Sequence, residues 1–467
     1  MINQSSDTAA RVFVVEGGVP LVGDITVNRA KNSALYLILA ALLTAEPVVL
    51  RDVPKLRDVL VLLDILEHFG VSVYWQERDL HLHAHTLTRT DAPYTMVSKM
   101  RASFVALGAL LGRSGEARIS MPGGCAFGPR PVDRHIKAFR QLGAQVQEEG
   151  GDFAVWLEQP LSGTVTFDAP TVGGTQNILL ASALGSDTVV IENAALEPEI
   201  ADLANMLNGM GAQVHGAGSS RIEITGVAKL TGIDYQPIPD RIEAGTLLLA
   251  AAATRGRVIL HQVVPAHLQA VTDTLRACGV IVRDVHGTVK NAVNGTVNVH
   301  NASNDAPNDA SNDAETSLEV DARGTLQPSN VRAQVYPGVP TDVQAPFGAF
   351  LATISGSSTV IDEVYPDRFT HVAELQRMGA QATLQEGTLH LHGGTLQGTK
   401  VHAADIRAGG ALIIAALAAT GTSHITGVAY IERGYEALDN RLQQLGARID
   451  LQEPANPVVV SSISSVA

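Results

Sequence analysis

The sequence is short of cysteine and of aromatic residues, and it contains no long apolar run. Only Cys125 and Cys278 occur among 467 residues, and Phe, Trp and Tyr together make up 4%. Two cysteines cannot build the disulfide framework of a small secreted protein, so we expect a cytoplasmic protein. No apolar run approaches the roughly 20 residues that span a bilayer, and Met1 to Ala10 lack the basic and apolar regions of a secretory signal. We therefore expect no membrane insertion.

Basic residues are also scarce relative to acidic ones. Lys and Arg number 33 against 47 Asp and Glu, which gives a formal net charge of −14. Non-specific nucleic-acid binding depends on basic side chains that neutralise phosphates, so we do not expect it. No P-loop is present, and no G-x-G-x-x-G follows a strand and opens a helix, so neither an ATPase nor a dinucleotide-binding fold is indicated. An anionic ligand would have to bind at a local cluster of cations.

What the chain does contain is enough apolar sequence for two domains. Apolar residues make up 45%, and the richness in Ala, Val, Leu and Gly is typical of packed α/β layers. The length of 467 residues exceeds what one core usually supports. Two domains of roughly 200 residues each are therefore expected.

One short pattern recurs six times, mostly at intervals of about 70 residues. It consists of a large apolar residue, Gly, a small residue, any residue, and usually Val or Ile, and its glycines are Gly70, Gly143, Gly211, Gly279, Gly379 and Gly446. Each Gly is typical of a helix end, because Gly tolerates the left-handed conformation that follows a helix. Cys278 takes the position that holds Phe, Leu or Met in other copies, so we expect it in the core.

A segment of small, apolar residues precedes each of these glycines by about 35 to 45 positions. The six segments begin at Lys31, Arg101, Gly174, Glu243, Gln344 and Arg407. Because they are apolar nearly all round, we expect helices inside a layer rather than on its surface. Each unit then consists of a strand, a buried helix, a strand, a second helix and a closing hairpin, with three units per domain.

The fourth interval is longer, about 100 residues, because residues 291–315 repeat Asn, Asp, Ala and Ser. Such a polar tract has almost nothing to bury, so we expect a surface insertion without a function.

Ionisable residues gather at the starts of the expected buried helices. They are Lys31 with Asn32, Arg101, Asp240 with Arg241 and Glu243, Asp342, and Arg407 with Asp405. Helix N-termini offer free N–H groups and a partial positive charge, so these ends can converge on an anion. A basic residue at this end is mildly unfavourable for the helix dipole, so its recurrence favours anion binding. Solvated surface charges stay open as the alternative.

Residues 121–133, MPGGCAFGPRPVD, contain three Gly and three Pro and are predicted to form a loop. Cys125 lies five residues before Arg130 and ten before His135. Nearby cations lower the pKa of a thiol from its reference of about 8.5, which would make Cys125 reactive and able to transfer a proton near neutral pH. A buried, inert cysteine is the open alternative.

Three histidines alternate along an expected strand and so share one face, as metal ligands could. They are His81, His83 and His85. The same LHLH pattern recurs at residues 389–392 as part of the repeated hairpin. We therefore expect no metal site.

These motifs resemble those of the enolpyruvyl transferase family, in particular its UDP-N-acetylglucosamine branch. The similarity runs nearly end to end and is broken chiefly by the Asn/Asp insertion. The matching segments are AKNSAL at 30–35, MRAS at 100–103, PGGCAFGPRPVD at 122–133, ENAALEPEI at 192–200, PDRIEAGT at 239–246, PTDVQAPF at 340–347, DRF at 367–369, DIRA at 405–408 and ERGYE at 432–436.

The resemblance implies an α/β fold of two similar domains, each made of three βαβαββ-type repeats around buried helices. This is an inside-out α/β barrel, with the active site in the cleft between the domains. The family's N-terminal strand belongs to the second domain. The resemblance therefore places the domains at 32–239 and at 1–31 plus 240–467, with the insertion near 291–315 in the second.

The resemblance also implies a transferase that needs no cofactor and no metal. It would move the enolpyruvyl group of phosphoenolpyruvate to the 3′-hydroxyl of UDP-N-acetylglucosamine. Lys31, Arg130 and Arg433 would hold the phosphate, and Arg368 and Arg407 would engage the carboxylate. The positions that match the lining of the UDP-sugar site are Asn32, Arg101, Pro131, Val132, Asp133, His135, Thr171, Val172, Gly173, Asp342 and Val364.

The implied mechanism is addition followed by elimination. Asp342 would act as the general base on the 3′-hydroxyl, while Cys125 protonates the methylene carbon. Lys31, Arg130 and Arg433 would stabilise the phosphate as it leaves the tetrahedral ketal. In the family this reaction is the first committed step of peptidoglycan synthesis, and fosfomycin alkylates the cysteine.

Two residues depart from the family pattern. Arg29 stands where the family commonly has Gly, and Asn28 stands in place of Ser. We expect them to alter affinity or the geometry of the crossover without changing the reaction. Two other functions stay open, namely transfer to shikimate 3-phosphate and UDP-sugar binding by a regulatory protein without turnover.

Overall fold

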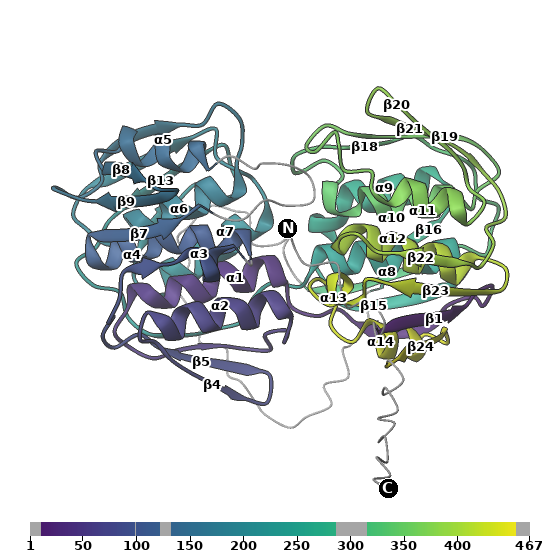
Figure 1. The fold of residues 1–467 in the computed structure, drawn as a ribbon, viewed down its shortest axis with the longest axis horizontal. Coiled ribbons are helices and arrows are strands. Elements are labelled where there is room, and N and C mark those ends of the chain that lie inside the picture. Colours follow the sequence, from purple (N-terminus) through teal and green to yellow (C-terminus); the bar gives the residue numbers. More distant parts are fainter. Residues whose placement is uncertain (1–10, 99, 122–131, 286–314, 454–467) are drawn as a thin grey trace, which may run out of the picture.

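The computed structural model describes residues 11–98, 100–121, 132–285 and 315–453. Within these residues the chain packs around two separate hydrophobic cores, one from residues 34–230 and one from residues 13–27 and 242–449. We call the elements around them the first and second lobes, which lie side by side in Figure 1. The domain boundaries at 31/32 and 239/240 stay a prediction, for which the two cores are the support.

Six helices occupy the centres of the lobes in the described residues, three in each (Figure 1). They are apolar on nearly every side, so each side must be covered. In α8, for example, all 13 residues are buried. The six are α1 (Lys31–Ala40), α4 (Ala106–Ser114), α6 (Val172–Ser182), α8 (Arg241–Ala253), α10 (Gln344–Leu351) and α12 (Ile406–Ala418). The predicted buried helices are confirmed, although the segment from Arg101 begins as the 3-10 turn η2 (Arg101–Val105).

Small residues let these central helices approach one another closely. A Cβ atom on Gly108 of α4 would lie 2.2 Å from the backbone oxygen of Asn177 in α6. The backbone N–H of Gly108 instead donates to Oδ1 of Asn177 at 2.6 Å. Such contact leaves little room for large rings, which accounts for the low aromatic content.

The second helix of every unit ends at a repeat glycine, as predicted. These helices are α2 (Arg57–His68), α5 (Asp133–Gln141), α7 (Pro198–Gly209), α9 (Gln269–Ala277), α11 (His371–Arg377) and α14 (Leu438–Gln444). One residue separates each helix from its glycine, and the six glycines have φ between 85° and 105°. Other residues rarely adopt this left-handed conformation, which explains why glycine recurs at the ends of these helices.

The described strands form six four-stranded sheets with one shared topology. Every sheet has one parallel pair of strands and two further strands joined antiparallel. In four sheets the parallel pair flanks one buried helix, whereas β2 before α1 pairs with β15 after α8, and β14 before α8 pairs with β3 after α1. The first lobe holds β14 (Ile233–Tyr235), β3 (Val48–Leu50), β5 (Asp79–His83) and β4 (Ser72–Gln76); β6 (Asp91–Ala92), β7 (Glu116–Ser120), β9 (Asp152–Trp156) and β8 (Gln145–Glu149); and β10 (Gly163–Thr166), β11 (Thr188–Glu192), β13 (Arg221–Thr225) and β12 (Gln213–His215).

The second lobe repeats the arrangement, with helices inside and sheets outside (Figure 1). Its sheets consist of β16 (Ile281–Val285), β17 (Thr316–Asp321), β15 (Arg257–Val263) and β2 (Val22–Thr26); β18 (Val331–Ala333), β19 (Gly356–Asp362), β21 (Thr388–Gly393) and β20 (Gln381–Gln385); and β22 (Lys400–His402), β23 (Thr422–Thr426), β1 (Val12–Glu16) and β24 (Arg448–Gln452). The two N-terminal strands, β1 and β2, therefore complete sheets of the second lobe.

The remaining described elements are short. They are the helices α3 (Tyr94–Val97) and α13 (Val428–Ile431) and the 3-10 turns η1 (Ala41–Leu43), η3 (Pro265–Leu268) and η4 (Thr341–Val343). No helix in the described ranges is both long enough and apolar enough to cross a membrane.

Candidate active site

Two chain crossovers join the lobes, and they carry the first charged residues of the site. Ala30 N donates to Ile238 O at 2.8 Å, so the crossovers run as a paired ribbon. The carboxylate of Asp240 then caps both helices that follow. Its Oδ1 accepts from the first turn of α8 at 2.8 and 3.0 Å, and its Oδ2 accepts from Lys31 N, the start of α1, at 3.2 Å. The predicted charges do therefore lie at helix starts.

Lys31 and Arg433, predicted to hold phosphate, share one buried carboxylate. Asp58 of α2 lies 3.1 Å from Lys31 Nζ through Oδ2 and 2.8 Å from Arg433 Nε through Oδ1. Burial raises the pKa of Asp58, but the charges of Lys31 and Arg433 outweigh burial and hold the pKa below its usual value. The contact joins α1 and α2 of the first lobe to the segment after α13 of the second.

Asp58 is a functional candidate that the sequence reasoning missed. Its side chain is buried on the same face of α2 as Val59, Leu62 and Leu66. An acid on the apolar face of an amphipathic helix requires a cationic partner. The place of Asp58 in the apolar pattern of residues 57–68 was therefore the sequence signal that could have revealed it.

Asp342, the predicted general base, is held by two arginines. Its Oδ1 lies 2.9 Å from Arg368 Nη1 and 3.1 Å from Arg407 Nε. Both arginine side chains are less than a tenth exposed, whereas the Asp342 side chain is 25% exposed. Burial raises the pKa of Asp342, but Arg407, Arg368 and more distant Lys31 overcome it and hold the pKa well below its usual range. In this arrangement Asp342 is fully ionised and a weak proton acceptor.

The predicted UDP-sugar residues of the first lobe lie at the starts of α5 and α6. Val132 and Asp133 open α5, and His135, buried in its first turn, contacts Asn177 Nδ2 through Nδ1 at 2.9 Å. Thr171 caps α6, its Oγ1 accepting from Gly174 N at 3.3 Å. A Cβ on Gly173 would lie 3.2 Å from His135 Cε1, so the two helix starts adjoin. Val172 is the first residue of α6.

Two further residues of the predicted UDP-sugar site, Asn32 and Val364, lie beside the charged clusters. Asn32 follows Lys31 in α1. Val364 lies between β19 and α11, and its N–H donates to Asp362 Oδ1 at 2.9 Å. Asp362 also accepts from Thr341 Oγ1, which neighbours Asp342 in the chain. The structure thus brings Val364 close to the Asp342 cluster.

Several predicted residues lie outside the described residues. They are Cys125, Arg130 and Pro131, together with the rest of their loop. Arg101 begins η2, but its side chain is not described. The roles assigned to these four residues stay predictions. Cys278, predicted to be core, is fully buried, and burial raises the pKa of its thiol to about 11.

A second interlobe ion pair involves the ENAALEPEI segment. Arg241 of α8 contacts Glu199 of α7, Nε to Oε1 at 3.0 Å and Nη2 to Oε2 at 3.1 Å. Both side chains are less than a tenth exposed. The pair connects the lobes beside the second crossover. The carboxylate of Glu199 is thus bound by Arg241, a residue of the protein itself.

We predict that the protein loses stability in acid because of His371, which lies in the chain three residues after Arg368 of the Asp342 cluster. It is fully buried, its Nε2 has no hydrogen-bond partner in the described part of the chain, and burial lowers its pKa from 6.5 to about 4. The unfolded chain therefore binds the proton first, so stability is complete above pH 6.5 and falls by about 3 kcal/mol as the pH drops toward 4. Denaturant melts from pH 7.5 to 4.5 should show less of this loss in His371→Gln. Equal pH dependence in both proteins would contradict the assignment.

The architecture matches solved enolpyruvyl transferases. The crystal structure of the enolpyruvyl transferase NikO from Streptomyces tendae superposes with a TM-score of 0.79 at 21% identity and covers 96% of this chain and 100% of that one. An EPSP synthase from Acinetobacter baumannii gives 0.70 at 19% identity, with 95% and 100% covered. The chain therefore has the enolpyruvyl transferase fold.

The family follows from the sequence comparisons. The model of EPSP synthase (3-phosphoshikimate 1-carboxyvinyltransferase) matches residues 15–442, and the chain belongs to this family. It is 49% identical over 453 residues to a UDP-N-acetylglucosamine 1-carboxyvinyltransferase of Thermus thermophilus, with 97% of this chain and 99% of the relative covered. The protein of that name from Deinococcus radiodurans is 47% identical over 442 residues, with 94% and 97% covered.

Proposed function

We propose that the protein transfers the enolpyruvyl group of phosphoenolpyruvate to the 3′-hydroxyl of UDP-N-acetylglucosamine and releases phosphate. The observation that carries the proposal is near-full-length identity of 47% to 49% to relatives named for this reaction. Two groups of buried and half-buried cations support it, since the donor substrate carries a phosphate and a carboxylate.

The phosphate would bind at Lys31 and Arg433, with Arg130 added from its loop. Asp58 holds the first two cations in place before the substrate arrives. Fixed cations aimed at the leaving phosphate stabilise its developing charge without reorganisation at the moment of reaction. This supply of charge requires no metal.

The carboxylate would bind at Arg368 and Arg407 and so free the general base. A second anion between the two guanidinium groups competes with Asp342 for them, which raises the pKa of Asp342. Asp342 then takes the 3′-hydroxyl proton as that oxygen bonds to C2 of phosphoenolpyruvate, and Cys125 delivers a proton to C3. In the second step Cys125, left as a thiolate, takes a proton from C3 as the C2–O bond to phosphate breaks, which restores the double bond. The proton on Asp342 passes to the departing phosphate.

The UDP-sugar would bind along Asn32, Val364 and the adjoining starts of α5 and α6. Helix N-termini suit its diphosphate because their N–H groups are unpaired donors. In a cell this reaction would begin peptidoglycan synthesis in the cytoplasm and so support cell shape and division.

A phosphate-release assay tests the proposed function directly. Purified protein with phosphoenolpyruvate and UDP-N-acetylglucosamine should release phosphate and form the enolpyruvyl sugar nucleotide in equal amounts. Shikimate 3-phosphate in place of the sugar nucleotide is the control and should give no release. Turnover with shikimate 3-phosphate alone, or binding of the sugar nucleotide without turnover, would overturn the proposal.

Cys125 should be the residue alkylated by fosfomycin. Cys125→Asp should retain part of the turnover, because a carboxylic acid also delivers a proton, and should resist the drug completely. Intact-mass and peptide mass spectrometry would locate the adduct. An adduct on Cys278, which is buried with a raised thiol pKa, would show that the site assignment is wrong.

A further inference from the structure

Arg29, the departure from the family pattern, is buried at the joint between the lobes. Its side chain is 3% exposed. Its backbone forms an isolated antiparallel bridge with Pro239, so it lies within the ribbon of the two crossovers. Two hydrogen bonds flank the bridge at 2.8 Å each, from Ala30 N to Ile238 O and from Asp240 N to Asn28 O.

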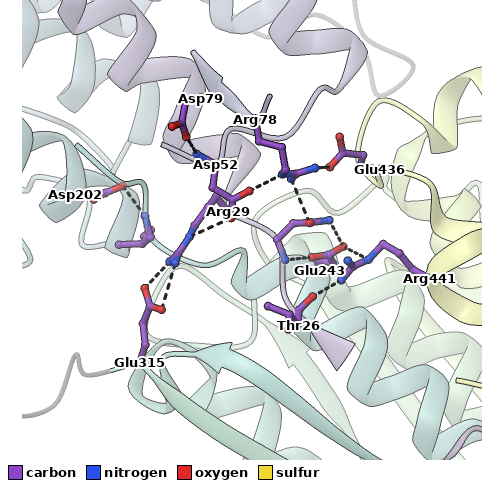
Figure 2. A network of polar contacts seen from close by, with 12 residues as sticks. Thr26, Arg29, Asp52, Arg78, Asp79, Asp202, Glu243, Glu315, Glu436 and Arg441 are labelled. Carbon is purple, nitrogen blue, oxygen red and sulfur yellow. Dashed lines mark hydrogen bonds and ion pairs between the residues drawn. The ribbon is translucent and has the colours of Figure 1, made fainter. Parts of the chain in front are cut away.

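The guanidinium group of Arg29 contacts three separate parts of the molecule, and Figure 2 shows its contacts with Asp52 and Glu315. Asp52, after β3 of the first lobe, lies 3.8 Å from Nε through Oδ2. Glu315, before β17 of the second lobe, pairs with Nη1 and accepts from Nη2 at 3.4 Å. Gln236 of the second crossover, with its amide oxygen turned toward Arg29, accepts from Nε at 3.2 Å and from Nη2 at 2.9 Å. One side chain therefore joins both lobes and both crossovers.

Asn28, the other departure, belongs to the same polar network. Its Nδ2 donates to Glu243 Oε1 at 3.0 Å, and its Oδ1 accepts from Arg78 Nη2 at 3.4 Å. Arg78 pairs with Asp52 of its own lobe and, at 3.0 Å, with Glu436 of the second lobe. The contacts of Arg29 are thus continued by another interlobe ion pair, between Arg78 and Glu436.

Glu315 is the last residue of the insertion at 291–315, for which the sequence predicts no function, and it makes this ion pair. Residues 291–314 lie outside the described residues.

We propose that Arg29, with Asp52 and Glu315, forms an ionic brace that restrains movement of one lobe against the other at the crossovers. A rotation of the lobes carries Asp52 and Glu315 in different directions, so it must lengthen at least one contact of a guanidinium that is shielded from water. Asp52 and Glu315 are 35% and 38% exposed, so salt ions reach them and weaken the brace. Gly at position 29, common in the family, could make none of these contacts.

The brace is distinct from the proposed catalytic groups but adjoins them. Lys31 follows Arg29 by two residues, and Asp240 follows the bridged Pro239. Restraint of the ribbon therefore also restrains the starts of α1 and α8. The restraint acts in the protein without substrates, so it can be tested whether or not the proposed reaction is correct.

Hydrogen–deuterium exchange of the ligand-free protein tests the brace. In Arg29→Ala the peptides covering residues 27–31 and 237–241 should exchange about tenfold to a hundredfold faster, the range expected for losing hydrogen bonds to a charged group. Glu315→Gln, a change at a partly exposed site, should give a smaller increase in the same peptides. The double variant Arg29→Ala/Glu315→Gln should exchange at the same rate as Arg29→Ala, because the Glu315 change removes an ion pair that Arg29→Ala has already removed. Arg29→Lys should restore part of the protection.

Salt and a matched variant separate the brace from general loosening. Raising NaCl from about 50 mM to about 1 M should speed exchange of these peptides in the parent and leave Arg29→Ala unchanged. Arg257 pairs with Glu319 on the neighbouring strand of one sheet, so Arg257→Ala removes an arginine ion pair within a single lobe. It should not affect the crossover peptides. Unchanged exchange in both Arg29→Ala and Glu315→Gln, or an equal effect of Arg257→Ala, would refute the brace.

Discussion

Asp342→Ala is expected to lower turnover about 100- to 10,000-fold, the usual contribution of a general base. The same change should tighten the binding of phosphoenolpyruvate, because Asp342 is the anion that occupies Arg368 and Arg407 in this structure. Both kcat and the KM for phosphoenolpyruvate should therefore fall. Affinity for the sugar nucleotide should change by only about 1 kcal/mol, the value of one hydrogen bond.

Steady-state phosphate release and calorimetric titration of the sugar nucleotide would measure these effects. Asp342→Asn is the matched control, since it keeps the shape of the side chain and removes only the charge. It should lose turnover to a similar extent. Near-normal turnover in either variant would exclude Asp342 as the base, and a raised KM for phosphoenolpyruvate would argue against competition for the arginines.

Lys31→Met is expected to lower kcat/KM for phosphoenolpyruvate about 100- to 1000-fold, as found when one preorganised charge-stabilising donor is removed. Part of that loss has a second origin. In the variant Asp58 has only Arg433 beside it, so this acidic side chain faces the incoming phosphate with less compensation. The double variant Lys31→Met/Asp58→Asn should therefore recover about tenfold of the lost efficiency.

The control for this cycle is Asp58→Asn alone, together with melting curves of all three variants. Binding of the sugar nucleotide should be nearly unchanged in Lys31→Met, because the lysine is assigned to the phosphate of the other substrate. If the double variant were no better than Lys31→Met, Asp58 would not be the group that tunes this cluster.

Local signals made much of the fold predictable. The six repeat glycines mark helix ends because the φ requirement is set by one residue and its immediate neighbours. The buried helices could be predicted equally well, since a helix that is apolar on every side has no polar face to expose to water.

The partners of charged residues were much harder to predict. Asp58 and Arg433 lie 375 positions apart, and Arg29 and Glu315 lie 286 apart. No spacing rule links residues that meet only after two lobes have formed. For Asp342, the sequence pointed to a helix start, but its partner Arg407 follows from the packing of α10 against α12, and its partner Arg368 comes from the segment between β19 and α11.

The position of β1 bears on how the chain folds as it leaves the ribosome. The first core is built from the continuous stretch 34–230, so it can form while the rest is still being made. The second cannot, because β1, which precedes every other described element of the chain, lies between β23 and β24 in its sheet. The strand must stay unpaired until residues 422–452 emerge, with more than four hundred residues of loop to close. Until that moment an apolar strand with Phe13 and Val15 on its buried face is exposed, and chaperone binding to the nascent chain should centre on this segment.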